Sequence, residues 1–259
     1  MNSALMENLR RHQFLFEELV RRDFVKKYKR TVLGMLWSVL SPLFNLLVLW
    51  LVFSNLLGSN VNHYVIFLFS GQLVFSYFSE ATNMGMLALM GNAGIFTKVN
   101  VPKCLFLFSQ NVTSLINFGL TLVIYFIFVL LDGLSVTPKF LCLLYPIACL
   151  VLFNLGVGMI LSALLVFFRD MQYLWGIMTH LIMWGSAIFF SIDSFSPAAQ
   201  MVFNLNPIYL YISYFREIVI NGSIPSFSVH ALMLFDALAV GLAGTWMYRR
   251  FNNEFLYYV

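Results

Sequence analysis

The stretch CLFLFSQNVTSLINFGLTLVIYFIFVLL, residues 104–131, decides the fold of this chain. It contains no charged side chain, and it exceeds the ~20 residues that a helix needs to cross a bilayer. The whole sequence has the same character, since it is 61% hydrophobic and 10% charged, against roughly 25% charged residues in ordinary globular proteins. Strands of a membrane barrel would instead alternate apolar and polar residues over short segments. We therefore expect an all-α integral membrane protein.

Six apolar runs of sufficient length follow one another along the 259 residues. The predicted spans cover about residues 32–55, 63–90, 104–131, 140–168, 171–191 and 227–248. Residues 192–226 are too interrupted by proline for a simple span, although they remain rich in Phe, Tyr and Ile. No internal repeat or low-complexity linker divides the chain, so residues 1–259 are predicted to form one transmembrane domain, with 249–259 as a tail.

The first 31 residues combine apolar positions near a helical period with many basic side chains, as in a helix that lies along a membrane surface. The basic residues are Arg10, Arg11, Arg21, Arg22, Lys26, Lys27, Lys29 and Arg30. A secretory signal peptide is the alternative, but the apolar run that starts at Val32 is too long for one and no small-x-small cleavage site follows it. We expect residues 1–31 to stay on the protein as an amphipathic interface helix.

The distribution of basic residues predicts the orientation. With six spans, the eight basic residues of the N-terminal segment share one side with five others, which makes thirteen of the fifteen Lys and Arg. The five others are Lys98, Lys103, Arg169, Arg249 and Arg250. By the positive-inside rule that side is cytoplasmic, so a multi-pass chain in the cytoplasmic (inner) membrane is expected, with both termini in the cytoplasm. The net charge of +4 then faces anionic lipid headgroups, and no nucleic acid partner is needed.

The sequence carries no pattern for metal or nucleotide chemistry. Its three Cys and four His include no C-x-x-C, H-x-x-x-H or H-E-x-x-H spacing, so no metal site is predicted. It also lacks the G-x-x-x-x-G-K-[ST] phosphate loop, so this chain is not expected to hydrolyse ATP or to bind a cofactor. Energy for any active transport must come from another chain.

Four short motifs follow one another at characteristic topological positions. They are Arg22-Asp23 with the basic stretch 26–30, Leu33-Gly34, Trp37 and Pro42; GIFTKVNVPK at 94–103; Phe167-Phe168-Arg169-Asp170; and Asn206-Pro207. In this order the chain resembles, over nearly its whole length, the membrane (permease) subunits of type 2 ABC exporters that move O-antigen, capsule or teichoic-acid polysaccharides.

This resemblance implies a function and a set of partners. The chain would form the channel of an exporter that moves a polysaccharide linked to undecaprenyl pyrophosphate across the membrane. A second copy of the chain and two cytoplasmic ABC ATPase subunits would complete the assembly, and the ATPases would bind ATP and Mg. Residues 192–226 would form a pair of short external, re-entrant-like helices that close the channel mouth, with a plain external loop as the alternative.

The resemblance also assigns roles to two cytoplasmic loops. The residues implied in coupling to the ATPase are Gly94, Ile95, Phe96, Lys98 and Pro102, with Arg169 and Asp170 in a secondary role. Ile95 and Phe96 form an apolar pair between glycine and proline, as a short docking helix with an apolar knob would. The alternative is an ordinary interfacial turn whose apolar residues enter the lipid.

Two further sets of residues suit a lipid-linked glycan. The candidates for binding the pyrophosphate headgroup are Arg22, Lys26, Lys29 and Arg30. This basic helix has two alternative roles: it binds the ATPase, or it only anchors the chain to anionic lipid. The candidate rings on which sugar faces would slide are Trp37, Tyr173, Trp175 and Trp184. Aromatic residues near span ends also form interface belts regardless of function.

Two acidic residues, Glu80 and Asp236, fall within the predicted spans. Because a charge inside a membrane is costly, each is expected to be neutral, to pair with a partner such as His180, or to face an aqueous pathway. The last reading supports the alternative function, an ion-coupled secondary transporter that uses Asp236 or Glu80. A membrane-embedded enzyme is disfavoured, since the external segment offers only Asp193 and Glu217, far apart in sequence.

Overall fold

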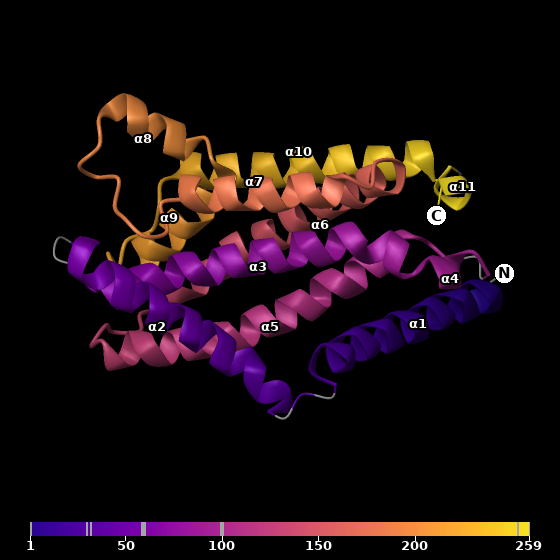
Figure 1. Ribbon diagram of the computed structural model, residues 1–259, viewed down its shortest axis with the longest axis horizontal. Coiled ribbons are helices and arrows are strands. Elements are labelled where there is room, and N and C mark those ends of the chain that lie inside the picture. The colour runs from indigo at the N-terminus through magenta and orange to yellow at the C-terminus, as the bar shows by residue number, and fades with distance from the viewer. Residues whose placement is uncertain are drawn as a thin grey trace.

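The computed structural model of the chain describes residues 2–29, 31, 33–57, 61–98, 101–252 and 254–258. Every regular element in these ranges is helical (Figure 1), which confirms the predicted all-α class. Five helical segments are long and apolar enough to cross a membrane: Trp37–Ser54, Tyr64–Ile95, Cys104–Leu131, Pro138–Phe167 and Phe227–Phe251. They correspond to five of the six predicted spans.

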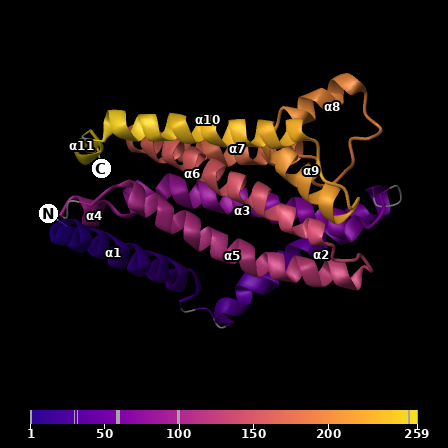
Figure 2. The same cartoon turned by 180° about the vertical axis from the view of Figure 1, so that it is seen from behind.

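The helices form an elongated bundle with two distinct ends (Figures 1 and 2). Their bounds are α1 Asn2–Tyr28, α2 Trp37–Leu57, α3 Tyr64–Gly91, α4 Ala93–Phe96, α5 Cys104–Leu131, α6 Leu144–Phe167, α7 Met171–Gly185, α8 Pro197–Asn204, α9 Pro207–Val219, α10 Phe227–Phe251 and α11 Phe255–Tyr258. Both termini, α4 and α11 lie at one end, which we call the terminal end, whereas α8 and α9 lie at the opposite end, the α9 end.

The predicted fifth span, residues 171–191, is shorter as a helix than expected. Helix α7 has 15 residues and ends at Gly185, which gives about 22 Å of helix against the ~30 Å of a hydrocarbon core. The backbone then turns through Ala187, whose φ is 46°. Side chains near and on α9 take up the carbonyls of this turn: Asn206 Nδ2 donates to Gly185 at 2.8 Å, and Arg216 Nη1 donates to Ala187 at 3.0 Å. Such protein donors are what irregular backbone requires inside a membrane protein.

Helix α3 lies at the centre of the bundle and packs against α5, α6 and α9. Helix α6 also lies against α10, at a very short backbone separation. A Cβ atom at Gly156 of α6 would come within 2.6 Å of the Gly241 nitrogen, and one at Gly244 would come within 2.7 Å of the Gly156 oxygen. Because lipid gives no hydrophobic drive for helix association, such close contact between small residues is a main source of helix packing in membranes.

Helix α1 runs from the terminal end along α5 toward the middle of the bundle (Figures 1 and 2). The buried carboxylate of Asp23 fastens it there, because Oδ2 accepts a hydrogen bond from Gln110 Nε2 of α5 at 2.6 Å. Arg22 Nη2 lies 2.7 Å from Asp23 Oδ1 and donates to Asn92 Oδ1, next to α4, at 2.8 Å. The predicted N-terminal helix is therefore present, and polar contacts hold it on the bundle.

The segment between α7 and α10 contains two short helices, as the resemblance implied, so the alternative of a plain loop is wrong. Each begins at a proline whose missing N–H costs nothing at a first helical position. Ser196 Oγ accepts from the Ala199 nitrogen at 3.4 Å, and Asn206 Oδ1 accepts from the Ile208 nitrogen at 3.0 Å. These capping contacts explain why the proline-interrupted stretch forms helices.

Candidate functional site

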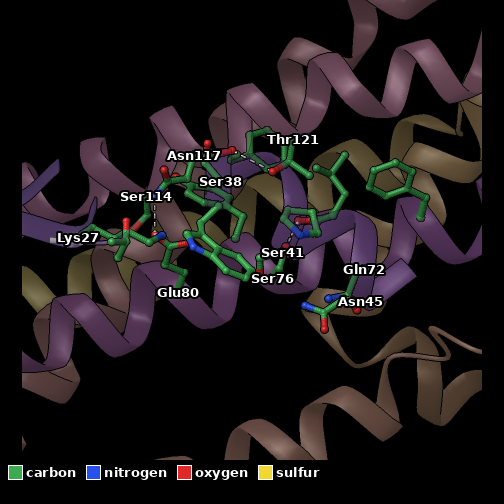
Figure 3. A pocket seen from close by; sticks show the side chains of 17 residues that line it. Lys27, Ser38, Ser41, Asn45, Gln72, Ser76, Glu80, Ser114, Asn117 and Thr121 are labelled. Atoms are coloured by element: carbon green, nitrogen blue, oxygen red, sulfur yellow. Dashed lines mark hydrogen bonds and ion pairs between the residues drawn. The ribbon is translucent and has the colours of Figure 1, made fainter. Parts of the chain in front are cut away.

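A polar cavity of about 460 Å³ lies between α2, α3 and α5, beside the end of α1 (Figure 3). Its polar wall residues are Ser38, Ser41 and Asn45 of α2, Gln72, Ser76 and Glu80 of α3, and Ser114, Asn117 and Thr121 of α5. On each helix the three positions follow a spacing of three or four residues, so they share one face. Each of these three largely apolar helices therefore has one polar face, and the three polar faces line the same cavity.

The chemistry of this wall is that of hydrogen bonding rather than of charge. Hydroxyl and amide side chains both donate and accept hydrogen bonds, so they can replace water around a neutral polar solute. Polar groups at membrane depth are costly unless they face protein or an aqueous space. The arrangement therefore suits a path for a hydroxyl-rich solute.

One ion pair lies in the cavity wall. Lys27 Nζ, from the last turn of α1, is 2.8 Å from Glu80 Oε1 of α3, and Asn117 Nδ2 of α5 donates to the same oxygen at 2.7 Å (Figure 3). The suggestion that His180 partners an intramembrane acid is wrong for Glu80, since the His180 ring bonds to the Gly176 carbonyl of its own helix. Lys27 supplies the counter-charge that lowers the cost of Glu80 in the membrane.

The second predicted acid, Asp236, lies on α10 and is half-buried. It is not among the described residues that line the cavity, and the described residues give it no hydrogen bond or ion pair. The two acids therefore do not form one site.

The predicted headgroup residues are not gathered into one cluster. Arg22 is engaged by Asp23 and Asn92, as described above. Lys26 and Lys29 are exposed, and the described residues give neither an ion pair. Arg30 lies outside the described residues. Lys26 and Lys29 are thus exposed at the end of α1, and the headgroup site stays a prediction.

The predicted coupling residues all belong to the terminal end (Figure 1). Gly94 and Ile95 lie in the four-residue helix α4, and Lys98 and Pro102 are exposed beyond it. Ile95 is half-buried against a cluster that includes Phe106 of its own chain, and the side chain of Phe96 lies outside the described residues. The exposed pair Arg169 and Asp170 forms the turn between α6 and α7. Two short loops thus face outward at the same end.

The predicted aromatic rings occupy three different environments. Trp37 lines the polar cavity. Trp175 is 8% exposed and packs edge-on against Phe78, with 6.0 Å between ring centroids. Tyr173 and Trp184 are 76% and 54% exposed on α7, and they are not among the described residues that line the cavity. Within one chain, the four rings therefore do not form a continuous track.

The terminal end also holds a contact that the sequence does not reveal. The tail folds back so that Phe255 of α11 is fully buried against Tyr248 and Phe167. Lys103, at the start of α5, donates to the carbonyl of Asn252 in the same tail. Burial lowers the pKa of the Lys103 ammonium below its ordinary value. The tail therefore connects the end of α6 with the segment that follows α4.

The polar cavity wall was missed in the sequence because most of its polar residues are uncharged and each span remains apolar overall. A signal was nevertheless available. Polar residues recur at 38, 41 and 45, at 72, 76 and 80, and at 114, 117 and 121. A stripe of this period on an apolar helix indicates a face that is turned away from lipid.

Comparison with known proteins agrees with this architecture. The profile of the family described as ABC-2 type transporter matches residues 15–220. The O-antigen export system permease protein RfbA of Klebsiella pneumoniae is 23% identical over 93% of this chain and 95% of its own length. The RfbA protein of Myxococcus xanthus is 27% identical over 92% of each chain, and the polysialic acid transport protein KpsM of Escherichia coli is 24% identical over 88% of this chain and 90% of its own.

These matches run through the N-terminal helix, the cavity helices and α9, and so include all the motifs that indicated a type 2 ABC exporter. The relationship predicted from those motifs is confirmed. The chain belongs to the ABC-2 type transporter family.

Proposed function

We propose that this chain is the channel-forming permease subunit of an ATP-driven exporter that moves a lipid-linked polysaccharide, carried on undecaprenyl pyrophosphate, across the cytoplasmic membrane. The polar cavity between α2, α3 and α5 is the observation that carries this proposal. The names of the relatives, which are export permeases for O-antigen and a transport protein for polysialic acid, support the same substrate class.

The cavity wall suits a sliding polymer for a physical reason. A glycan presents a regular series of hydroxyl groups, and serine, threonine, asparagine and glutamine side chains exchange hydrogen bonds with each in turn. No wall residue other than the paired Lys27 and Glu80 carries a charge among the described residues, so a neutral segment meets no strong local trap. Trp37 adds one ring against which an apolar sugar face can pack.

The energy source in this proposal is a pair of ATPase subunits at the terminal end. The loop that contains α4 and the turn at Arg169 and Asp170 both lie there and are available for docking. We place that end in the cytoplasm by the positive-inside rule, because Lys98, Lys103, Arg169, Arg249 and Arg250 belong to the loops and helix ends there (Figure 1). Lys26 and Lys29 then stand near the cytoplasmic entrance, where a lipid pyrophosphate would arrive.

A second copy of the chain completes the channel in this proposal. Helix α2 exposes a long apolar face that contains Phe44, Leu47, Val48 and Leu51, and α7 exposes Leu174, Ile177 and Leu181. These faces must meet either lipid or protein. A second copy that covers them would also close the open side of the polar cavity and bring the exposed rings of α7 toward a shared path.

The test is a mild-detergent pull-down of the tagged chain from its native membrane, with identification and counting of the subunits by mass spectrometry. We expect two copies of this chain and two ATP-binding subunits. Lys98→Gln should reduce the recovered ATPase and leave the dimer intact, whereas Lys139→Gln, which removes the same charge at the α9 end, should leave both unchanged.

The opposite outcome identifies the alternative function. If no ATPase is recovered under several gentle conditions, and if transport follows a proton gradient and is lost in Asp236→Asn, the chain is an ion-coupled carrier. Asp236 forms no ion pair with the described residues, so this variant removes the acid without breaking a salt bridge among them.

A further inference from the structure

A second polar cavity lies at the α9 end, opposite the termini. Its volume of about 320 Å³ is at the lower end of the roughly 300–1,000 Å³ that small-molecule sites occupy. Three segments that are distant in sequence build its wall: residues 61–67, residues 191–193 and residues 209–221. The fold therefore brings Asp193 and Glu217, which the sequence alone leaves separate, to one space.

Helix α9 supplies most of the chemistry of this cavity. Tyr209, Ser213, Arg216 and Glu217 stand at positions i, i+4, i+7 and i+8, so they share one face of the helix. Asp193 reaches the same space from the irregular segment that follows α7. A phenol, a hydroxyl, a guanidinium and two carboxylates are thus within one wall.

Arg216 is the positive group in this wall. The residue is 8% exposed; its Nη atoms donate to the carbonyls of Ala187 and Ile188 at 3.0 Å, and its guanidinium lies 3.4 Å from the centroid of the Phe67 ring. Nε has no partner among the described residues. The guanidinium is thus held firmly by backbone carbonyls and contributes a fixed positive charge to the wall.

The carboxylates of Asp193 and Glu217 can accept further hydrogen bonds. Asp193 Oδ2 accepts from Ser191 Oγ at 2.5 Å, and Glu217 accepts from Asn221 Nδ2 at 2.8 Å and from Ser223 Oγ. A carboxylate has about four lone-pair positions, more than these contacts use. Two carboxylates against one guanidinium disfavour an anionic ligand, whereas hydroxyl groups that donate to the carboxylates match the acceptors that the wall still offers.

We propose that this space, the exit cavity, binds a segment of the exported polysaccharide through its hydroxyl groups as the polymer leaves the channel. The inference rests on the proposed export function and on the placement of the α9 end outside the cell. Hydrogen bonds to Glu217 and Asp193 hold the emerging segment, and because the site is small and the ligand groups are neutral hydroxyls, it releases the segment again. The exit cavity thus opposes return of the polymer between transport steps.

The test is site-specific photo-crosslinking in the host cell, with the complete transporter and the polysaccharide that the host itself makes. A diazirine amino acid replaces Val61, which lines the exit cavity, or Ile224, which is exposed at the same end but is not among the described lining residues. We expect the Val61 probe, and not the Ile224 probe, to capture the polymer as a slowly migrating, glycan-positive species.

Two variants connect the capture to the polar groups. Glu217→Gln and Asp193→Asn keep the shape of each side chain, and each should reduce capture at position 61 roughly tenfold, the effect of one lost hydrogen bond to a charged acceptor. Asp193 is exposed, so its variant carries little risk to folding. The amount of chain in the membrane should stay the same.

The failures of the two proposals are distinguishable. Equal capture at both probe positions, or no capture at position 61 while polymer still reaches the surface, would overturn the exit cavity alone. Unchanged capture in both carboxylate variants would overturn it as well. If deletion of the gene leaves the surface polysaccharide unchanged, the export function fails, and the exit cavity fails with it.

Discussion

Lys27 Nζ and Glu80 Oε1 lie 2.8 Å apart, and this contact joins the last turn of α1 to the middle of α3 at the wall of the polar cavity. The two side chains are 34% and 28% exposed, so water screens part of their attraction. The pair nevertheless places the N-terminal helix in direct contact with the proposed path. Movement of α1 would therefore displace the Lys27 ammonium and change the electrostatic environment of the Glu80 carboxylate.

Removal of the lysine tests this contact. Lys27→Met leaves Glu80 with Asn117 and without a counter-charge, so we expect a loss of stability of about 1 kcal/mol and reduced export. Thermal unfolding in detergent and the amount of surface polysaccharide measure the two effects. Arg21→Met, an exposed basic position of the same helix outside the proposed headgroup residues, is the control. Glu80→Gln in the Lys27→Met background should recover part of the stability; no recovery would mean that the pair is not coupled.

The contact between α1 and α5 depends on Asp23. Arg22→Ala removes one of its two partners and the bond to Asn92, and we expect it to destabilise the docking of α1 by about 1–3 kcal/mol, because a buried carboxylate loses a charged donor. Limited proteolysis within residues 13–29 should become faster. Arg21→Ala, at an exposed position one residue earlier, should leave the rate unchanged. Equal rates in both variants would show that these bonds do not hold α1.

The short backbone separation between helices α6 and α10 depends on Gly156 of α6. Gly156→Ala would place its Cβ atom 2.6 Å from a backbone nitrogen of α10, so the helices must move apart. We expect a loss of about 1–3 kcal/mol, typical of overpacking, seen as a lower unfolding temperature in detergent. Gly176→Ala is the control, because a Cβ atom there meets nothing within 4 Å. A similar temperature for both variants would contradict this packing.

The polar cavity predicts a position-specific effect on export. Ser41→Leu adds apolar bulk and removes a hydroxyl from the wall, so surface polysaccharide should fall by roughly tenfold or more if the polymer loses about 1.4 kcal/mol or more of favourable contact along its path. Ser54→Leu makes the same change on the same helix at a position that is not among the described lining residues. It should export normally. Equal export by the two variants would remove the cavity from the path.

Much of the fold could be predicted from the sequence because its signals are local. Apolar runs such as 104–131 specify a helix without reference to any other segment, since an unpaired backbone group in lipid is too costly for any other structure. Pro197 and Pro207 likewise mark the starts of α8 and α9 through their own missing N–H groups. Two residues that the sequence singled out, Trp37 and Glu80, lie in the cavity wall, and their predicted roles stay predictions.

Two features could not be predicted from local sequence signals. One is the end of helix α7 at Gly185, and the other is the separation of the predicted aromatic rings into different environments. The run 171–191 contains no Asp, Glu, Lys or Arg, but its helix ends at Gly185, where Asn206 and Arg216 of a later segment satisfy the carbonyls of the turn. Likewise, Trp175 is distinguished from Tyr173 and Trp184 only by burial against α3. The neighbouring helices decide which face of an apolar helix is buried against protein. The sequence does not indicate that face when apolar residues are spread evenly around the helix.

By itself, then, the sequence determined a bundle of membrane helices, a basic N-terminal helix and, before the last span, two short helices that begin at proline. Each of these features depends on a local property of its own segment: apolar length, basic charge or a missing N–H group. Only the tertiary structure decided which polar groups meet. Lys27 and Glu80 are 53 positions apart, and Asp23 and Gln110 are 87 positions apart. Such pairs depend on the orientation of packed helices, so the polar cavity and the exit cavity exist only once the bundle has formed.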